Sequence, residues 1–250
     1  MNLLVGILAF GSEYLDSSLG MGYGTALAPM LILLGYNPLK VVPAILISQL
    51  ITDIAACISH HRLNNVDLRA DSKDFRIALI LGLVSSLGVI IACLVAVKIP
   101  QYILTFYIGL LVFAMGILIL VNIKKNFSFS FSKIIGVSFL ASFNKGISGG
   151  GYGPLVMGGQ ILSGVFPKNA VGITAFAEAI TCFVGFMTYL ILGKIIDWKL
   201  TLMLILCATP AVPFAALSVK KINERRLKIF VGILIMLLGL LTLFKISRGS

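Results

Sequence analysis

Five ionisable side chains lie inside long apolar stretches of this sequence, where a charge is hard to accommodate. They are Glu13, Asp16, Asp53, Lys145 and Glu178. Ionisable groups at membrane depth are rare and usually functional. Glu178 is the strongest candidate, because it lies in the middle of its segment and shares a helix face with Thr174 and Thr181. For Glu13 and Asp16, a functional role is no better supported than a position near an interface or a purely structural ion pair.

Two glycine clusters also lie within apolar stretches, each beside polar residues. The first is Gly20-Met21-Gly22-Tyr23-Gly24, and the second is Gly149-Gly150-Gly151-Tyr152-Gly153. Glycine lets backbone N–H groups approach a ligand, and the helix start that follows offers partial positive charge to an anion. Close packing of helices through small residues is the alternative. Because two aligned clusters occur, we favour an anion site, to which Lys145 would add a fixed positive charge.

A polar stripe accompanies each glycine cluster. Gln49 lies beside Ser48 and Thr52, and Asp53 follows Gln49 at i+4 on the same helix face. Acids around an anion site look contradictory, but burial disfavours the charged form of a carboxyl group. Glu178 could then be neutral or exchange a proton with each transport cycle, with Asp53 as a second proton-coupling residue. The rival interpretation is a cation or metal permease in which the acids bind the solute.

The composition places these residues in a lipid environment. The chain of 250 residues is 59% hydrophobic and 12% charged, with a mean hydropathy of +1.07. A soluble domain needs about twice as many charged residues. The net charge of +11 comes from basic residues in short gaps between apolar runs, which is typical of the loops that set membrane orientation. We therefore expect a multi-pass protein of the cell membrane that binds no nucleic acid.

The apolar runs predict an all-α polytopic fold. Six runs are long enough to span a bilayer, at 41–59, 77–97, 103–123, 170–192, 200–219 and 227–246. Two longer regions, 3–34 and 134–164, are interrupted by polar residues and by the glycine clusters. Broken helices at membrane depth need protein or a water-filled cavity to satisfy their exposed backbone groups. They are the best sequence indication of a transporter's binding site.

The sequence contains an internal repeat. The shift that carries Gly20 onto Gly149, which we call the repeat offset, also carries Pro38 onto Pro167 and Gln49 onto Glu178. We expect one integral membrane domain made of two four-segment repeats, 1–126 and 127–250. If each broken segment enters and leaves on one face, the second repeat is inverted and the loop basic residues divide thirteen against six. If the broken segments span fully, the division is eleven against eight, so the charges favour the inverted, re-entrant arrangement.

These motifs resemble the sulfite exporter TauE/SafE family. The first matching motif is Gly-Met-Gly-Tyr-Gly-Thr-x-Leu-x-Pro at 20–29, and the second runs from Asn144 through the glycine cluster to Pro154 and on to Gly158-Gly159-Gln160. The resemblance covers essentially the whole chain. It implies a permease, usually an exporter, for sulfite, organosulfonates or related small sulfur-containing or carboxylate anions. One departure is Tyr23, which interrupts the three successive glycines of the commoner family form.

We therefore predict a secondary transporter, not an enzyme, that binds a small anion between the broken segments. The predicted lining comprises Gly22, Tyr23, Gly24, Gln49, Lys145, Ser148, Gly151, Tyr152, Gly153 and Gln160. Glu178 and Asp53 are the predicted proton-coupling residues. No cofactor and no metal are expected, and assembly into a homo-oligomer is left open.

Two interpretations outside secondary transport also remain. A gated channel would show uncoupled flux that follows the voltage. Gly146-Ile147-Ser148-Gly149 resembles the motif of intramembrane serine proteases, but such a serine needs a base within reach. The two histidines, His60 and His61, end a segment and lead into a loop. The hydrolase interpretation is therefore weak.

Overall fold

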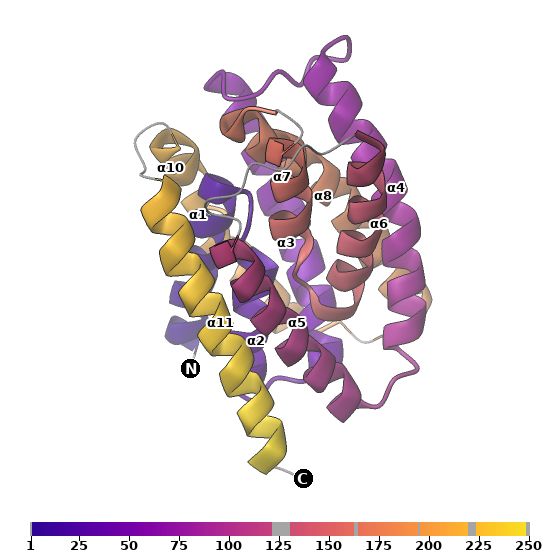
Figure 1. Cartoon of the computed structure of the whole chain (residues 1–250). Coiled ribbons are helices and arrows are strands. Elements are labelled where there is room, and N and C mark those ends of the chain that lie inside the picture. The colour runs from indigo at the N-terminus through magenta and orange to yellow at the C-terminus, as the bar shows by residue number, and fades with distance from the viewer. Residues whose placement is uncertain (1, 122–130, 163–164, 195, 220–223, 249–250) are drawn as a thin grey trace.

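The computed structural model describes residues 2–121, 131–162, 165–194, 196–219 and 224–248, and all regular structure among them is α-helical (Figure 1). The helices are α1 (Asn2–Leu19), α2 (Tyr23–Leu33), α3 (Pro38–Arg62), α4 (Lys73–Ala96), α5 (Gln101–Val121), α6 (Phe131–Ser148), α7 (Tyr152–Leu162), α8 (Pro167–Ile191), α9 (Trp198–Ala208), α10 (Ala211–Ser218) and α11 (Glu224–Arg248). The predicted all-α class is confirmed.

Five helical stretches of the described residues are long and apolar enough to cross a membrane: α3, α4, α5, α8 and the α9–α10 stretch, Trp198–Ser218. They coincide with five of the six predicted runs, and the sixth, 227–246, lies within α11. The stretch predicted as one span at 200–219 is divided at Thr209 and Pro210. Proline has no N–H to donate, so the helical hydrogen bonding is interrupted there.

Polar caps fix where three of these helices begin. The side chain of Asn37 accepts a hydrogen bond from the N–H of Leu39 at 2.8 Å. Ser72 accepts one from Phe75 at 3.1 Å at the start of α4, and Asp197 begins α9 in the same way. These side chains satisfy N–H groups that have no partner inside the helix.

Both broken segments turn at their glycine clusters. Between α1 and α2, Gly20 and Gly22 have φ values of 66° and 145°, and between α6 and α7, Gly149 and Gly151 have values of 77° and 82°. Side chains disfavour this region of φ, so glycine is what allows the chain to turn. The repeat offset also carries the bounds of α1, α2 and α3 onto those of α6, α7 and α8.

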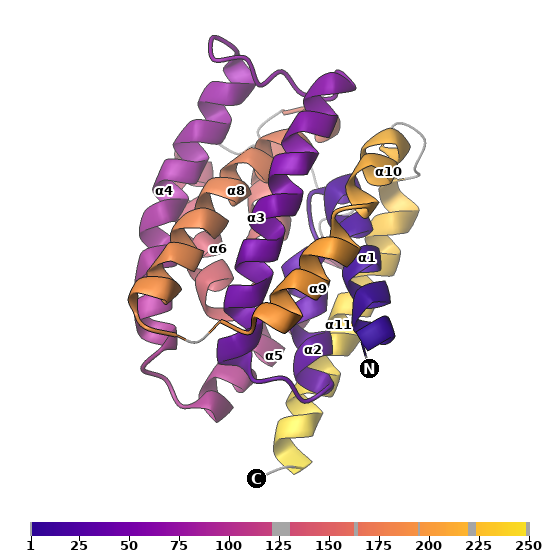
Figure 2. The same ribbon diagram turned by 180° about the vertical axis from the view of Figure 1, so that it is seen from behind.

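The two broken segments open toward opposite ends of the molecule. The open end of α1–α2 lies at the same end as both chain termini, and that of α6–α7 at the other end (Figure 1 and Figure 2). Hydrogen bonds mark the two ends. Lys245 of α11 donates to the carbonyl of Ile32 at 2.8 Å at the terminal end, and Asn169 donates to Asp74 at 2.7 Å at the other.

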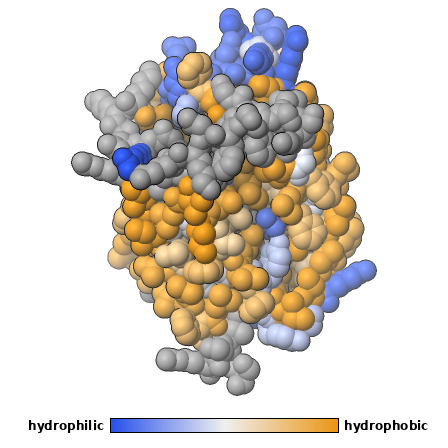
Figure 3. Space-filling model, in the orientation of Figure 1, coloured by the Kyte–Doolittle hydropathy of each residue, from blue (hydrophilic) through white to orange (hydrophobic). Residues whose placement is uncertain are grey.

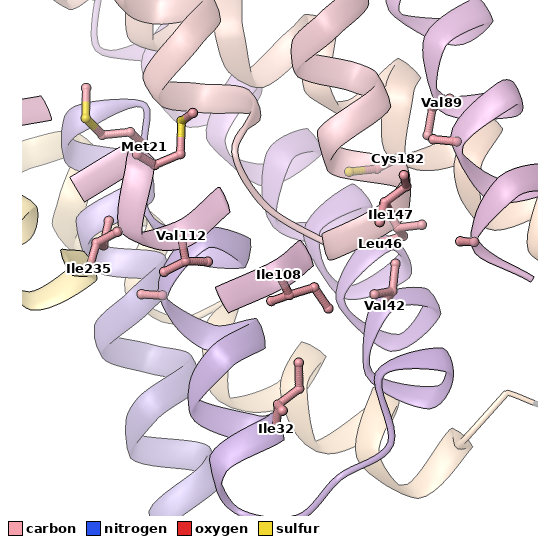
Figure 4. Packing of buried hydrophobic residues seen from close by; sticks show 14 of the residues in the cluster. Met21, Ile32, Val42, Leu46, Val89, Ile108, Val112, Ile147, Cys182 and Ile235 are labelled. Atoms are coloured by element: carbon pink, nitrogen blue, oxygen red, sulfur yellow. The ribbon is translucent and has the colours of Figure 1, made fainter. Parts of the chain in front are cut away.

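The exterior is apolar around the middle of the molecule and polar at the end that carries the α3–α4 loop (Figure 3). Large apolar side chains are exposed on several helices, among them Leu83, Leu206 and Phe244. Such a surface suits lipid rather than water. The interior contains a large apolar cluster, in which Val42, Leu46 and Ile147 gather from α3 and α6 (Figure 4).

Candidate functional site

The two glycine turns touch each other at the centre of the molecule. A Cβ atom on Gly24 would collide with the carbonyl oxygen of Gly149, and one on Gly150 would lie 2.6 Å from the carbonyl carbon of Gly24. The N–H of Gly151 donates to the hydroxyl of Thr25 at 2.9 Å. In this conformation the backbones themselves fill the space between the clusters, so close packing through small residues is present. An anion at the glycines stays a prediction.

Lys145 lies beside the turn of α6 and forms a buried ion pair. Its Nζ is 2.7 Å from Oε1 of Glu178 on α8, and the two side chains are 1% and 4% exposed. Nζ also donates to the side-chain oxygen of Gln49 on α3. Removing one partner of such a pair leaves an uncompensated charge, which typically costs roughly 3–5 kcal/mol. The structure therefore brings three of the predicted site residues into direct contact.

The network continues to α1 through Gln49. The side-chain N–H of Gln49 donates to Oδ2 of Asp16 at 3.2 Å, and Oδ1 of Asp16 accepts from the backbone N–H of Tyr23 at 3.1 Å. Asp16 is thus a buried member of the site, although the sequence left it as equally well interfacial. The chain Asp16–Gln49–Lys145–Glu178 connects α1, α3, α6 and α8, and we call it the buried polar network.

Acids outnumber the lysine in this region. Carboxylate oxygens of Asp16, Asp53 and Glu178 lie within 4.8 Å of one another. Oδ2 of Asp53 has no hydrogen-bond partner among the described residues, and neither does Oε2 of Glu13. The other oxygen of Glu13 accepts from the hydroxyl of Ser17 at 2.6 Å.

A small cavity of about 10 Å³ is lined by the three clustered acids. It has room for about one water-sized group. Carboxylate oxygens are ligands that hard cations prefer. The arrangement can thus hold a proton or a cation between negative groups.

Matched positions of the repeat meet within the network. The repeat offset relates Gln49 to Glu178, and it also relates Asp16 to Lys145. The sequence reasoning missed the second match, although the same offset would have revealed it. Lys145 binds both members of the first pair, and Asp16 binds one of them.

A second correspondence involves His60, which was expected to lead into a loop but is fully buried. Its Nε2 is 2.9 Å from the carbonyl oxygen of Ser17, at the end of α1. At the matching positions of the second repeat, the hydroxyl of Tyr189 donates to the carbonyl of Gly146 at 2.8 Å. Helix ends beside both glycine turns are therefore held by the same kind of bond.

The remaining predicted residues lie around the turns. The hydroxyls of Tyr23 and Ser48 are 2.6 Å apart, and those of Tyr152 and Ser85 are 2.9 Å apart. Each tyrosine following a turn is therefore anchored to a neighbouring helix. Both tyrosines are fully buried.

Ser148 and Gln160 make local contacts. The hydroxyl of Ser148 accepts from the N–H of Gly150 at 3.1 Å and donates to the carbonyl of Asn144 at 2.8 Å. It supports the turn between α6 and α7. Gln160 donates to Thr174 at 2.8 Å, which joins α7 to α8. Gln160 is thus bound to the helix that carries Glu178, through Thr174.

Spanning helices, an apolar exterior and a charged network at the crossing of two broken segments define a polytopic membrane transporter. The family model described as sulfite exporter TauE/SafE matches residues 4–244, and the chain belongs to this family. It is therefore a multi-pass membrane permease and not an enzyme, as predicted.

A relative in Bacillus subtilis (strain 168) is named "Probable membrane transporter protein YtnM". It is 26% identical over 248 residues, which cover 93% of this chain and 79% of that protein. No solved structure gives a significant match to this chain.

Proposed function

We propose that the protein transports a small anion, such as sulfite or an organosulfonate, together with a proton, and that the anion and Glu178 compete for Lys145. The observation that carries this proposal is the buried ion pair of 2.7 Å between Lys145 and Glu178. Lys145 is the one basic residue that the sequence places in the interior of an apolar segment, since Lys228 and Lys245 lie at the two ends of the run 227–246. An anion that enters this region would therefore seek the same charge that Glu178 occupies.

If an anion displaces Glu178 from Lys145, the negative charge of Glu178 loses the compensation that Lys145 provided. If the carboxylate left Lys145 while ionised, it would lie unpaired beside Asp16 and Asp53, whose oxygens are within 4.8 Å. A buried unpaired charge costs several kcal/mol. Protonation of Glu178 removes this cost and frees Lys145. The anion and the proton therefore bind together, and loss of the proton returns Glu178 to Lys145 and expels the anion.

The architecture supports a central binding site. The recurrence of helix bounds at the repeat offset and the opposite opening of α1–α2 and α6–α7 support two inverted repeats, 1–126 and 127–250. Transporters of this design bind solutes near the bilayer midplane where the repeats meet. Separation of the touching glycine turns would expose the N–H groups of Gly22, Gly24, Gly151 and Gly153 to an anion held by Lys145.

Proteoliposomes provide the test of this function. We expect uptake of an organosulfonate to be accelerated by a pH gradient that drives protons in the same direction as the solute. Lys145→Gln should lose most anion binding, because no other fixed positive charge is present in the buried polar network. A solute flux that ignores the pH gradient in the wild type would contradict coupling.

A cation permease is the second candidate, and the cluster of Asp16, Asp53 and Glu178 favours it. A point at the centre of three oxygens within 4.8 Å of one another lies no more than about 2.8 Å from each, close to the range of hard-cation bonds. Divalent-cation uptake in the same vesicles distinguishes the two. Cation flux that needs Glu178 and no anion would support this alternative.

A further inference from the structure

Three cavities follow one another from one end of the molecule toward the buried polar network. An open cavity of about 630 Å³ is lined largely by residues of the α3–α4 loop. That loop lies at the end of the molecule opposite the chain termini (Figure 1 and Figure 2). A second cavity of about 270 Å³ lies between the end of α1, the middle of α7 and the start of α8. The third is the cavity of about 10 Å³ beside Asp16, Asp53 and Glu178.

Neighbouring cavities share a residue of α8. Lys168 lines the first and the second cavity, and Val171 lines the second and the third. Ala175 and Glu178 continue the lining of the third cavity. Residues at these spacings lie on one face of a helix. One face of α8 therefore leads from a lysine at the surface to the ion pair, a rise of about 15 Å over ten residues.

Apolar side chains separate the second cavity from the third. Leu19, Met157 and Val171 all line the second cavity and are 2%, 1% and 3% exposed. Met157 and Val171 pack tightly against the turn of the first broken segment. A Cβ atom on Gly20 would lie 2.6 Å from the sulfur of Met157 and 3.4 Å from Cα of Val171. We call Leu19, Met157 and Val171 the apolar barrier.

The charges of the open cavity favour an anion. Its lining includes Arg62, Arg69, Lys168 and a single acid, Asp67. Asp67 forms an ion pair of 2.8 Å with Arg69. The hydrogen bonds that Arg69 donates to the carboxylate of Asp67 hold the pKa of Asp67 below its usual value. Asp67 therefore stays ionised and compensates Arg69, and the positive charge of Arg62 and Lys168 remains in excess. A cleft lined by one sign of charge concentrates ions of the other sign.

We propose that a small anion enters from the cytoplasm through the first two cavities and that Lys168 and Arg62 select for negative charge at the entrance. In this conformation the apolar barrier separates such an anion from Lys145 and from the small third cavity with its three acids. The proposal rests on the anion transport proposed above, and it adds the entry route, the charge filter and the barrier. The cytoplasmic side is assigned because this end carries the basic excess of the inverted arrangement.

Cysteine modification tests the route without measuring transport. In a parent whose native cysteines are replaced by alanine, Val171→Cys is compared with Val42→Cys. The two valines are repeat mates, and both are buried in the same apolar cluster, in which Figure 4 labels Val42. They differ in that Val171 lines the second and third cavities, whereas Val42 lines none of the three. We expect a small thiol reagent added from the cytoplasmic side to modify Val171→Cys much faster. Equal rates, or faster modification from the other side, would overturn the route.

The charge filter is tested by the ratio of two rates at Val171→Cys. An anionic and a cationic thiosulfonate reagent of similar size are used, each with and without Lys168→Gln. Loss of a positive charge at the entrance should lower the anionic-to-cationic ratio by about ten-fold at low salt. Lys40→Gln, the same charge change at the opposite end of the molecule, should leave the ratio unchanged. An unchanged ratio in Lys168→Gln removes Lys168 from the filter.

The two proposals fail in different ways. Modification rates do not depend on proton coupling, so a confirmed route with transport that ignores the pH gradient would refute only the coupling by Glu178. Conversely, coupled transport with an inaccessible Val171→Cys would refute only the route.

Discussion

Lys145 and Glu178 were each identified from the sequence as charges within apolar segments, but their contact was not. The two residues lie on different helices, and only the crossing of α6 with α8 brings them to 2.7 Å. Periodicity along a single helix reveals a polar face, not its partner. The correspondence between Asp16 and Lys145 could have been predicted from the sequence, because it follows from the same offset that aligns the glycines.

The burial of His60 shows a different limit. Its place at the end of an apolar run suggested an exposed loop entrance, yet its ring contacts the end of α1 through Ser17 and the side chain of Asn65 at 3.1 Å. Sequence alone does not show that a distant helix covers a segment end. The structural role of His60 is indicated by its repeat counterpart, Tyr189, which makes the equivalent hydrogen bond to the end of α6.

Lys145→Gln is expected to reduce both stability and anion binding, for separable reasons. It leaves Glu178 buried without its partner, which should lower the free energy of unfolding by roughly 3–5 kcal/mol. Protonation of Glu178 would reduce this loss of stability, because it removes the unpaired charge. Thermal unfolding in detergent measures this loss. The double variant Lys145→Gln/Glu178→Gln removes both charges and should recover most of the stability.

Anion binding should stay lost in the double variant, because the positive charge is absent. Lys145→Arg preserves that charge and should keep partial transport. Solute affinity that is unchanged in Lys145→Gln would remove Lys145 from the site.

At the level of elements, the two breaks were located correctly because glycine clusters are a local signal. What the sequence left open was whether the glycines bind a ligand or permit close packing. The structure shows their backbones in contact, at Gly24 with Gly149 and Gly150. The division of the stretch at 198–218 was missed because Pro210 lies in an otherwise continuous apolar run.

Gly24→Ala is expected to destabilise the protein strongly, since its methyl group would occupy the position of the Gly149 carbonyl oxygen. Overpacking usually costs about 1–3 kcal/mol, and a backbone neighbour cannot yield as a side chain does. The matched control is Gly11→Ala in the same broken segment, where a Cβ atom meets nothing within 4 Å. That control should be neutral or stabilising by a few tenths of a kcal/mol to about 1 kcal/mol. Equal melting temperatures of the two variants would contradict the packing of the turns.

At the scale of the whole molecule, the division of the basic residues between the loops favours inverted halves. The broken segments α1–α2 and α6–α7 open toward opposite ends of the molecule (Figure 1 and Figure 2). An inverted arrangement would place them in this way, and the topology stays a prediction. Hydropathy alone could not decide the matter, because a broken segment of 18 and 11 residues is long enough either to span or to return.

Asp71→Cys and Lys194→Cys test the topology in intact cells. Asp71 follows α3 and Lys194 follows α8. If the halves are inverted, an impermeant thiol reagent outside the cell should modify Lys194→Cys and leave Asp71→Cys unmodified until the membrane is opened. Modification of both from the same side is what fully spanning broken segments would give, and it would exclude the inverted arrangement.

The competition between anion and Glu178 for Lys145 is the central claim, and transport by Glu178→Gln tests it most directly. Gln49 shows that the fold holds an amide at the matching position of the first repeat, so the variant should fold and insert. With Lys145 no longer paired to a carboxylate, the variant should bind the organosulfonate and exchange it across the membrane. It should no longer respond to a pH gradient. Wild-type pH-driven accumulation by Glu178→Gln would contradict the account.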